Sequence, residues 1–150
     1  SKGSVSFYYF KWNKLGLGYI DDKLIARNKE LISKDKIFIS QNYGAGKEPS
    51  QVLNMPFIPN KNSCCTETYL CIGPFKNAEI SKNVISYIKT KFFRYLVRLK
   101  KNTQGAYKSV YEFVPIQDFT KSWTDKELYK KYLLTEVEIE HIEKVIKSMD

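Results

Sequence analysis

The stretch Gly44-Ala45-Gly46-Lys47 comes closer than any other in this sequence to a known catalytic motif, the phosphate-binding loop of nucleotide hydrolases. The full G-x-x-x-x-G-K-[ST] pattern needs glycine at position 41 and serine or threonine at position 48, where the chain has Gln41 and Glu48. We therefore interpret the stretch as a glycine-rich turn and not as a nucleotide-hydrolysis site. Its backbone N–H groups remain candidates for contact with a phosphate.

Three cysteines, Cys64, Cys65 and Cys71, form the second group of reactive side chains. An odd number cannot pair completely within one chain, and the spacing matches neither a C-x-x-C metal half-site nor a disulfide framework. We expect reduced and partly buried thiols.

The other candidates for catalysis are single residues with simple structural roles. His141 lies among glutamates, far in sequence from every cysteine, and is interpreted as a surface histidine. Glu127 and Lys130 are the nearest approach to the acid-and-lysine group with which nucleases hold Mg²⁺, but a capping glutamate and a solvent-facing lysine explain them better. We predict no catalytic residue and no metal site in this chain.

Positive charge is concentrated in one part of the sequence. The chain has 150 residues and a formal net charge of +9. Residues 81–111 contain eight Lys/Arg and no Asp/Glu, whereas residues 1–80 contain eleven against seven and residues 112–150 contain six against nine. This asymmetry favours a polyanionic partner such as nucleic acid, although a solvated helix face has the same composition.

The basic run coincides with one long predicted amphipathic helix, from Ser81 to about Lys101, with Ser81 as its N-cap and residues 102–105 as its stop. Apolar residues recur at spacings of three and four, as on one helix face: Val84, Ile88, Phe92, Tyr95, Leu96 and Leu99. Cations occupy an arc of about 80° on the opposite side. Lys91, Arg94, Arg98 and Lys101 form this arc, and together with Lys100 they are the predicted phosphate contacts.

Base recognition needs other side chains, because phosphate contacts carry no sequence information. Side-chain amides suit the edge of adenine. Asn102 and Gln104, after the basic helix, and Gln41 and Asn42, before the glycine turn, are the candidate base contacts. Each is also typical of a helix stop or a turn.

Around these residues the sequence predicts an α+β fold, with short strands mostly in the N-terminal half and helices towards the C-terminus. Runs of β-branched and aromatic residues predict strands at residues 5–10, 36–40, 68–72 and 109–114. Two T-x-x-E capping boxes, at Thr124 and Thr135, each predict the start of a helix. Phe92, Tyr95, Trp123 and the aromatic run at 7–10 are expected in the core.

Length and hydrophobicity bound the organisation of the chain. With 43% hydrophobic residues over 150 positions, residues 1–150 are expected to form a single domain. No apolar run reaches the length of a spanning helix and no secretory signal pattern is present, so we expect no membrane association and a cytoplasmic location. The chain begins Ser1-Lys2-Gly3 without Met, which suggests a part of a longer protein.

Several segments, in the same order, resemble the C-terminal region of bacterial type II restriction-modification adenine methylases: CTETYL at 65–70, IGPF at 72–75, VISYIKTKFFR at 84–94, FVPIQDF at 113–119, and WTD at 123–125 with Leu128-Tyr129. The resemblance covers the chain from about Lys36 to its end. In that family this region is the target-recognition domain, which follows a Rossmann-like methyltransferase domain. The family's Asn-Pro-Pro-aromatic tetrad and its glycine-rich loop for S-adenosylmethionine are absent from this chain.

The resemblance implies sequence-specific binding of double-stranded DNA as the target-recognition domain of an adenine-N6 DNA methyltransferase. S-Adenosylmethionine and methyl transfer are then expected in the methyltransferase domain of the parent chain, and no catalysis is expected from this chain alone. Whether the parent chain is also a restriction endonuclease stays open. Two other classes remain open: a binder of single-stranded nucleic acid or RNA, since the chain is 15% aromatic, and a restriction nuclease domain.

Overall fold

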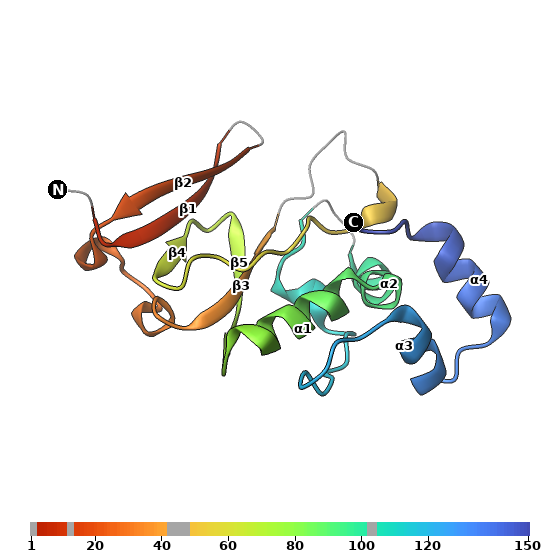
Figure 1. The fold of residues 1–150 in the computed structure, drawn as a ribbon. Coiled ribbons are helices and arrows are strands. Elements are labelled where there is room, and N and C mark those ends of the chain that lie inside the picture. The colour runs from red at the N-terminus through yellow and green to blue at the C-terminus, as the bar shows by residue number, and fades with distance from the viewer. Residues whose placement is uncertain (1–2, 12–13, 42–48, 102–104) are drawn as a thin grey trace.

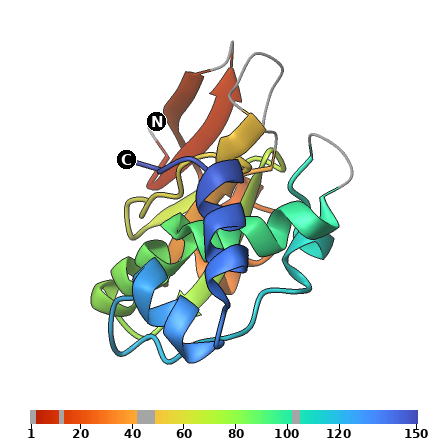
Figure 2. The same ribbon diagram turned by 90° about the vertical axis from the view of Figure 1, so that its right-hand side faces the viewer.

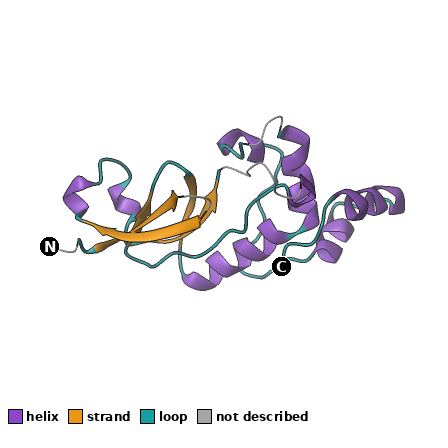
Figure 3. Ribbon diagram, turned by 90° about the horizontal axis from the view of Figure 1, so that it is seen from above, coloured by secondary structure: helices purple, strands orange, loops and turns teal. Residues whose placement is uncertain are grey.

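We describe the protein from a computed structural model, which describes residues 3–11, 14–41, 49–101 and 105–150. It confirms the α+β fold, with the strands and two short 3-10 helices towards one end of the molecule and the α-helices towards the other (Figures 1 and 3). The strands and α-helices follow one another as β1 (Val5–Lys11), β2 (Lys14–Ile20), β3 (Asp35–Ser40), β4 (Ser63–Cys65), β5 (Tyr69–Phe75), α1 (Ala78–Lys89), α2 (Lys91–Lys100), α3 (Asp125–Lys131) and α4 (Glu136–Val145).

A three-stranded sheet, in the order β2-β1-β4, forms the N-terminal end. β1 and β2 pair as an antiparallel hairpin, and β4 adds to β1 in parallel. Gly16 and Gly18 in β2 let the ring of Tyr9 lie across the hairpin, since a Cβ atom on Gly16 would come within 2.3 Å of that ring. β2 is therefore an edge strand that has no side chains at these two positions.

A second sheet pairs β3 with β5 in antiparallel fashion and carries the main core. β3 is buried almost throughout because α1 covers it on the helical side. Its residues Ile37 and Ile39 pack in the large core cluster that all four α-helices share. On the other side, Phe38 joins Tyr8 of β1 and Tyr69 of β5 in a separate aromatic cluster.

The predicted single helix over residues 81–101 is wrong in its continuity. The chain forms α1 and α2 with a break at Thr90, and α1 begins at Ala78 with Asn77 as its N-cap rather than at Ser81. Thr90 takes an extended backbone (φ −62°, ψ 150°), and its hydroxyl accepts a hydrogen bond from the backbone N–H of Phe93 at 3.1 Å. It therefore ends one helix and caps the next.

The two predicted capping boxes are present at the starts of the last two helices. Thr124 and Thr135 each accept a hydrogen bond from the N3 backbone N–H, and the N3 glutamate side chain accepts one from the backbone N–H of the cap, which starts α3 and α4 as predicted. Between these helices Leu133 takes a left-handed backbone conformation with φ 53°. The residue is 85% exposed, so burial of its side chain does not account for this conformation. Figure 2 shows α4 crossing in front of the other helices.

Three of the four predicted strands are present and one is not. The strands expected at 5–10, 36–40 and 68–72 are confirmed as β1, β3 and β5. The strand expected at 109–114 is wrong: the chain forms the short 3-10 helix η4 (Lys108–Tyr111) instead. β2 and β4 were not predicted, because glycines interrupt the alternation in the first and the second has only three residues. No helix in the described ranges is long and apolar enough to cross a membrane.

Candidate nucleic-acid interface

Arg94, the centre of the predicted phosphate-binding face, is fully buried at 0% exposure. Its guanidinium donates to three backbone carbonyls: Thr90 at 3.3 Å, Gln51 at 3.2 Å and Lys89 at 3.1 Å. The expectation that Arg94 contacts a phosphate is therefore wrong. The reason is that α2, after the break at Thr90, turns this side towards the segment 51–52.

Lys101 forms a hydrogen bond to the same segment. Its ammonium donates to the Val52 carbonyl at 2.8 Å, and burial lowers its pKa from the ordinary value. Val52 is a β-branched residue with φ 68°, a backbone conformation that such residues rarely adopt. Arg94 and Lys101 thus hold two successive carbonyls around a strained residue. Both charges serve the fold at this position.

Lys91 and Arg98 act on α4. Lys91 pairs with Glu143, which also accepts a hydrogen bond from the Tyr129 hydroxyl at 2.9 Å. Arg98 donates to the carbonyl of Val145, the last residue of α4, at 3.2 Å. Lys91 is largely covered, with 18% of its side chain exposed, whereas Arg98 remains exposed. Of these two predicted phosphate ligands, only Arg98 keeps a solvent-facing charge.

Lys100 forms an ion pair with Glu112 at 2.8 Å and lies over the ring of Phe113. Its side chain is 39% exposed, so its charge is accessible to solvent. The predicted cationic face is therefore not one continuous surface. Each of its five residues contacts a neighbouring segment of the chain, and two of them, Arg98 and Lys100, also face outwards.

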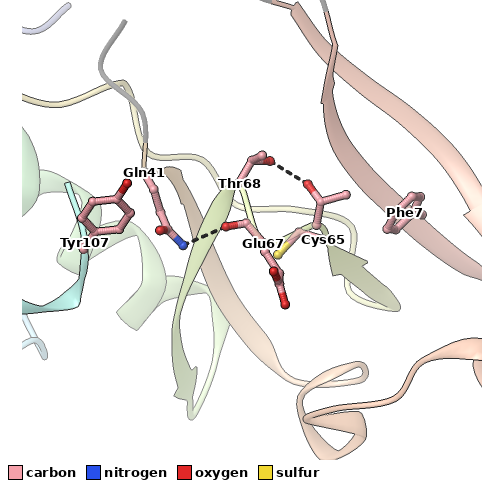
Figure 4. Close-up of a pocket in the computed structure, with 7 residues that line it drawn as sticks. Phe7, Gln41, Cys65, Glu67, Thr68 and Tyr107 are labelled. Carbon is pink, nitrogen blue, oxygen red and sulfur yellow. Dashed lines mark hydrogen bonds between the residues drawn. The ribbon is translucent and has the colours of Figure 1, made fainter. Parts of the chain in front are cut away.

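A shallow groove of about 590 Å³ lies between the N-terminal hairpin and the helical end. Its middle is the turn from β4 to β5, where the hydroxyls of Thr66 and Thr68 are hydrogen-bonded at 2.6 Å (Figure 4). Aromatic rings lie at its two ends, Phe7 from β1 and Tyr107 from the chain before η4. The groove is lined by Phe7, Gln41, Cys65, Thr66, Glu67, Thr68 and Tyr107.

Gln41 is the predicted base-contacting residue that the structure brings to this groove. Its side-chain N–H₂ donates to the carbonyls of Glu67 at 3.0 Å and Tyr69 at 3.3 Å, which fixes the amide in place. Its side-chain oxygen accepts no hydrogen bond from the described residues. The amide therefore presents an acceptor at a held position.

The backbone of Gln41 also joins two distant parts of the chain, because its carbonyl accepts a hydrogen bond from the N–H of Ala106. The segments that carry the other three amides, Asn42 and the pair Asn102 and Gln104, thus adjoin two residues in direct contact. Those three amides themselves lie outside the described residues.

Glu67 and Tyr107 were not predicted as members of a site, and Phe7, which was expected in the core with the rest of the aromatic run, lines the groove. Glu67 is almost fully exposed, at 98% of its side chain, and Arg27 lies 4.0 Å from its carboxylate. Tyr107 is 55% exposed, and its ring folds back over Gly105, where a Cβ atom would come within 2.1 Å of it. Gly105, expected as a helix stop, is the one local signal for this ring position.

The cysteines do not add reactive chemistry to the groove. Burial raises the pKa of Cys65 to about 12, and it also raises those of Cys64 and Cys71. The neighbouring Lys36 is buried and donates to three backbone carbonyls, so its ammonium has its own partners. Thiols with raised pKa values are weak nucleophiles at neutral pH.

The remaining candidates for catalysis have structural surroundings. His141 is exposed and packs edge-on against Tyr95 at 5.6 Å between ring centres. Glu127 forms the capping box of α3 and an ion pair with Lys121 at 2.6 Å. Across the described parts of the chain no three His, Cys, Asp or Glu side chains gather closely enough to hold a metal ion.

No protein-family model, no curated protein and no solved structure matches this chain.

Proposed function

We propose that this chain binds double-stranded DNA as the target-recognition part of a restriction-modification adenine methyltransferase, in the cytoplasm, and that the groove side of the molecule reads the bases. The observation that carries the proposal is the amide of Gln41, held at the groove by two backbone carbonyls, together with the contact between Gln41 and Ala106, which joins β3 to the chain before η4 at the same groove. Side-chain amides in register with base edges are what direct readout requires.

Charge around the groove supports the same face. Arg27 lies beside Glu67 at the groove, and Lys108 is exposed one residue after Tyr107. On α2, outside the lining of the groove, Arg98 is exposed and the side chain of Lys100 is 39% exposed. These four cations are the proposed phosphate contacts. Glu67 suits the exocyclic amine of cytosine, which donates into the major groove.

The proposal predicts that removing a phosphate-contacting charge and removing a base-contacting side chain have different effects on DNA binding. Arg98→Ala and Lys100→Ala should each weaken binding to all duplexes alike and make the salt dependence shallower by about one unit per lost phosphate contact. Gln41→Ala and Glu67→Ala should change the preferred sequence selected from a duplex library. Selection by all four variants of the wild-type sequence, with unchanged affinity, would contradict the proposal.

A single-stranded nucleic acid is the second candidate, favoured by the exposed ring of Tyr107 and the half-buried ring of Phe7 at the two ends of the groove. Stacking on unpaired bases uses such rings. Competition between labelled duplex and unlabelled single strands separates the two: duplex should compete at least tenfold better. In that case Tyr107→Ala should affect duplex binding less than Glu67→Ala does.

S-Adenosylmethionine belongs, on this proposal, to the methyltransferase domain of the longer protein. This chain alone should then incorporate no methyl group from S-adenosylmethionine and should not cleave plasmid with Mg²⁺. Either activity in the purified chain would replace the proposal with an enzymatic one. Binding by the chain alone should also be weak and salt-sensitive, because the second domain supplies further contacts.

A further inference from the structure

The outer edge of β2 has no strand neighbour in the part of the chain that the structure describes. β2 pairs with β1 on one side and ends the sheet on the other (Figure 1). Beyond the ladder with β1, its backbone forms no hydrogen bond to another described residue. An edge strand leaves a row of unpaired N–H and C=O groups, which can pair with a further strand.

β2 lacks the features that usually protect such an edge. Natural edge strands carry proline, a bulge or charged side chains. β2 contains no proline, its register with β1 is regular, and its one charge is Lys14 at the first position. From Leu15 to Ile20 it has only leucine, isoleucine, tyrosine and two glycines. The edge of β2 is therefore open to a second strand.

One face of β2 presents an apolar row. Leu15, Leu17 and Tyr19 are 51%, 47% and 57% exposed. The register with β1 places this row on the face of Tyr8, whereas Phe7 lies on the opposite face and lines the groove. The apolar row is therefore separate from the groove. Exposed apolar side chains at a sheet edge favour association with another protein surface.

The residues of β2 complement one another when two copies of the strand run antiparallel. If the copies pair about Leu17, that residue faces its own counterpart and Leu15 faces Tyr19. Every member of the apolar row then has an apolar or aromatic neighbour across the strands, which stabilises a strand pair. On the other face, Gly16 lies opposite Gly18. The full length of β2 is paired in this register.

The charges at the two ends of β2 favour the same arrangement. Lys14 starts the strand, and residues 21–23, directly after its end, carry two carboxylates and one ammonium, all exposed. Antiparallel pairing about Leu17 places Lys14 opposite Ile20 of the second copy, beside this net negative charge. Parallel pairing would place the two copies of Lys14 next to each other. A second copy, antiparallel, thus complements both the apolar row and the charged ends.

We propose that the protein dimerises through β2, which pairs in antiparallel fashion about Leu17 with β2 of a second copy. The two three-stranded sheets then form one continuous sheet. Opposed residues of antiparallel strands point to the same face, so the two-fold axis that relates the copies is perpendicular to the sheet. The face that carries Phe7 therefore points the same way in both copies, and both grooves lie on one side of the dimer.

This position of the grooves extends the proposed function. A dimer with both grooves on one side meets a single duplex with two base-reading sites related by a two-fold axis, the arrangement that reads palindromic sequences. The use of the dimer on DNA rests on the proposed function, whereas the dimer itself does not.

Cysteine at position 17 tests the pairing directly. Opposed residues of antiparallel strands have Cα atoms about 4.5–5.5 Å apart, which suits a disulfide. Under mild oxidation, Leu17→Cys should form a covalent dimer about tenfold faster than Leu15→Cys, which faces Tyr19 of the second copy and not itself. The wild type measures the background from the three native thiols. Equal rates of cross-linking for the two variants would overturn the proposal.

Sedimentation equilibrium over a range of protein concentrations measures the association itself. The wild type should approach twice the mass of the chain. Leu17→Lys places two like charges face to face at the two-fold axis and should stay monomeric. Leu99→Lys, at a 55% exposed position of α2, is the matched control and should dimerise like the wild type. A monomeric wild type, or a Leu17→Lys variant that dimerises equally well, would overturn the proposal.

Titration of a labelled duplex separates the dimer from the proposed function. Two chains of the wild type should bind one duplex, and Leu17→Lys should bind about tenfold more weakly despite its added positive charge, because it loses the second groove. A wild type that dimerises but binds no duplex at low salt would overturn the proposed function and leave the dimer. A wild type that binds duplex but stays monomeric would overturn the dimer and leave the proposed function.

Discussion

At the scale of single residues, positive charge in this protein has two different uses. Arg94 and Lys101 donate hydrogen bonds to the carbonyls of Gln51 and of the strained Val52. Lys11 and Lys14 have no ion-pair partner among the described residues. Both kinds of lysine or arginine look alike in a composition count, and only the neighbours of each side chain distinguish them.

Arg94→Ala should lower the free energy of unfolding by about 3 kcal/mol, because three carbonyls lose a charged donor in a buried position. Urea denaturation measures the loss. Arg98→Ala is the matched control, with an expected cost below about 1 kcal/mol for an exposed residue. Equal effects of the two substitutions would contradict the structural role of Arg94.

Leu133→Gly should stabilise the protein by about 0.5–1 kcal/mol, because Leu133 has a left-handed backbone and buries little of its side chain. Asn28 has a similar φ of 54°, but asparagine tolerates this conformation, so Asn28→Gly should change stability little. Thermal denaturation of the two variants side by side checks the difference. A loss of stability in Leu133→Gly would show that the exposed leucine has a packing partner.

At the scale of elements, the break between α1 and α2 determines which segments the cations of the basic run contact. Asp125, the first residue of α3, accepts hydrogen bonds from the backbone N–H groups of Lys91 and Phe92 at 3.0 and 2.9 Å. Thr90 and Asp125 thus satisfy the start of α2 from two directions. Without this break the cations would follow one continuous helix face.

Thr90→Ala should destabilise the protein by about 1–2 kcal/mol, since it removes the N-cap of α2 in a buried position. Thr135→Ala, which removes an exposed N-cap from α4, should cost about 1 kcal/mol. If α1 and α2 were one helix, alanine at position 90 would instead stabilise it by its higher helix propensity. The sign of the change in chemical denaturation therefore tests the break.

The sequence predicted those elements whose signals are local. The capping boxes at Thr124 and Thr135 name their own helix starts, and β3 is a short apolar run. The break at Thr90 was missed because the apolar period of three and four continues through it, and because the second cap of α2, Asp125, lies 34 positions away in the sequence from Lys91. The groove was missed for the same reason: Gln41 was identified, but its contact with Ala106 is a tertiary one.

At the scale of the whole molecule, α2 connects the other helices. Lys91 and Arg98 contact α4, Lys100 contacts Glu112 after η4, and Arg94 contacts the segment before residue 53. The carboxylate partners in this arrangement titrate, whereas the arginine and the carbonyls do not. Acid should therefore weaken some of these connections before others.

Stability should fall as the pH drops below about 4.5. Hydrogen bonds from Lys121 and Thr124 lower the pKa of Glu127 from 4.5 to about 2. Burial raises the pKa of Glu143, but the bonds from Lys91 and Tyr129 outweigh it and the net shift is downward. A carboxylate with a lowered folded pKa contributes its full stability above the unfolded value and loses it as the pH falls through the folded one.

Thermal melts between pH 7 and pH 2.5 measure this dependence. Glu143→Gln should lower the Tm at pH 7 and should show a smaller fall below pH 4.5 than the wild type. Glu140→Gln, at an exposed position of the same helix, should follow the wild-type curve. Identical acid profiles for Glu143→Gln and the wild type would contradict the role of the Lys91–Glu143 pair.

The segment between Gln41 and Gln51 is held at both ends by bonds to different parts of the fold. Gln41 bonds to Thr68 and Ala106, and the carbonyls of Gln51 and Val52 bond to Arg94 and Lys101. None of these bonds uses a side chain from residues 42–48. These anchoring bonds therefore do not depend on which side chains stand at positions 42–48. On the proposed function, exchanging residues 42–48 for another sequence of the same length should change the preferred DNA sequence while the bonds of Gln41, Gln51 and Val52 remain.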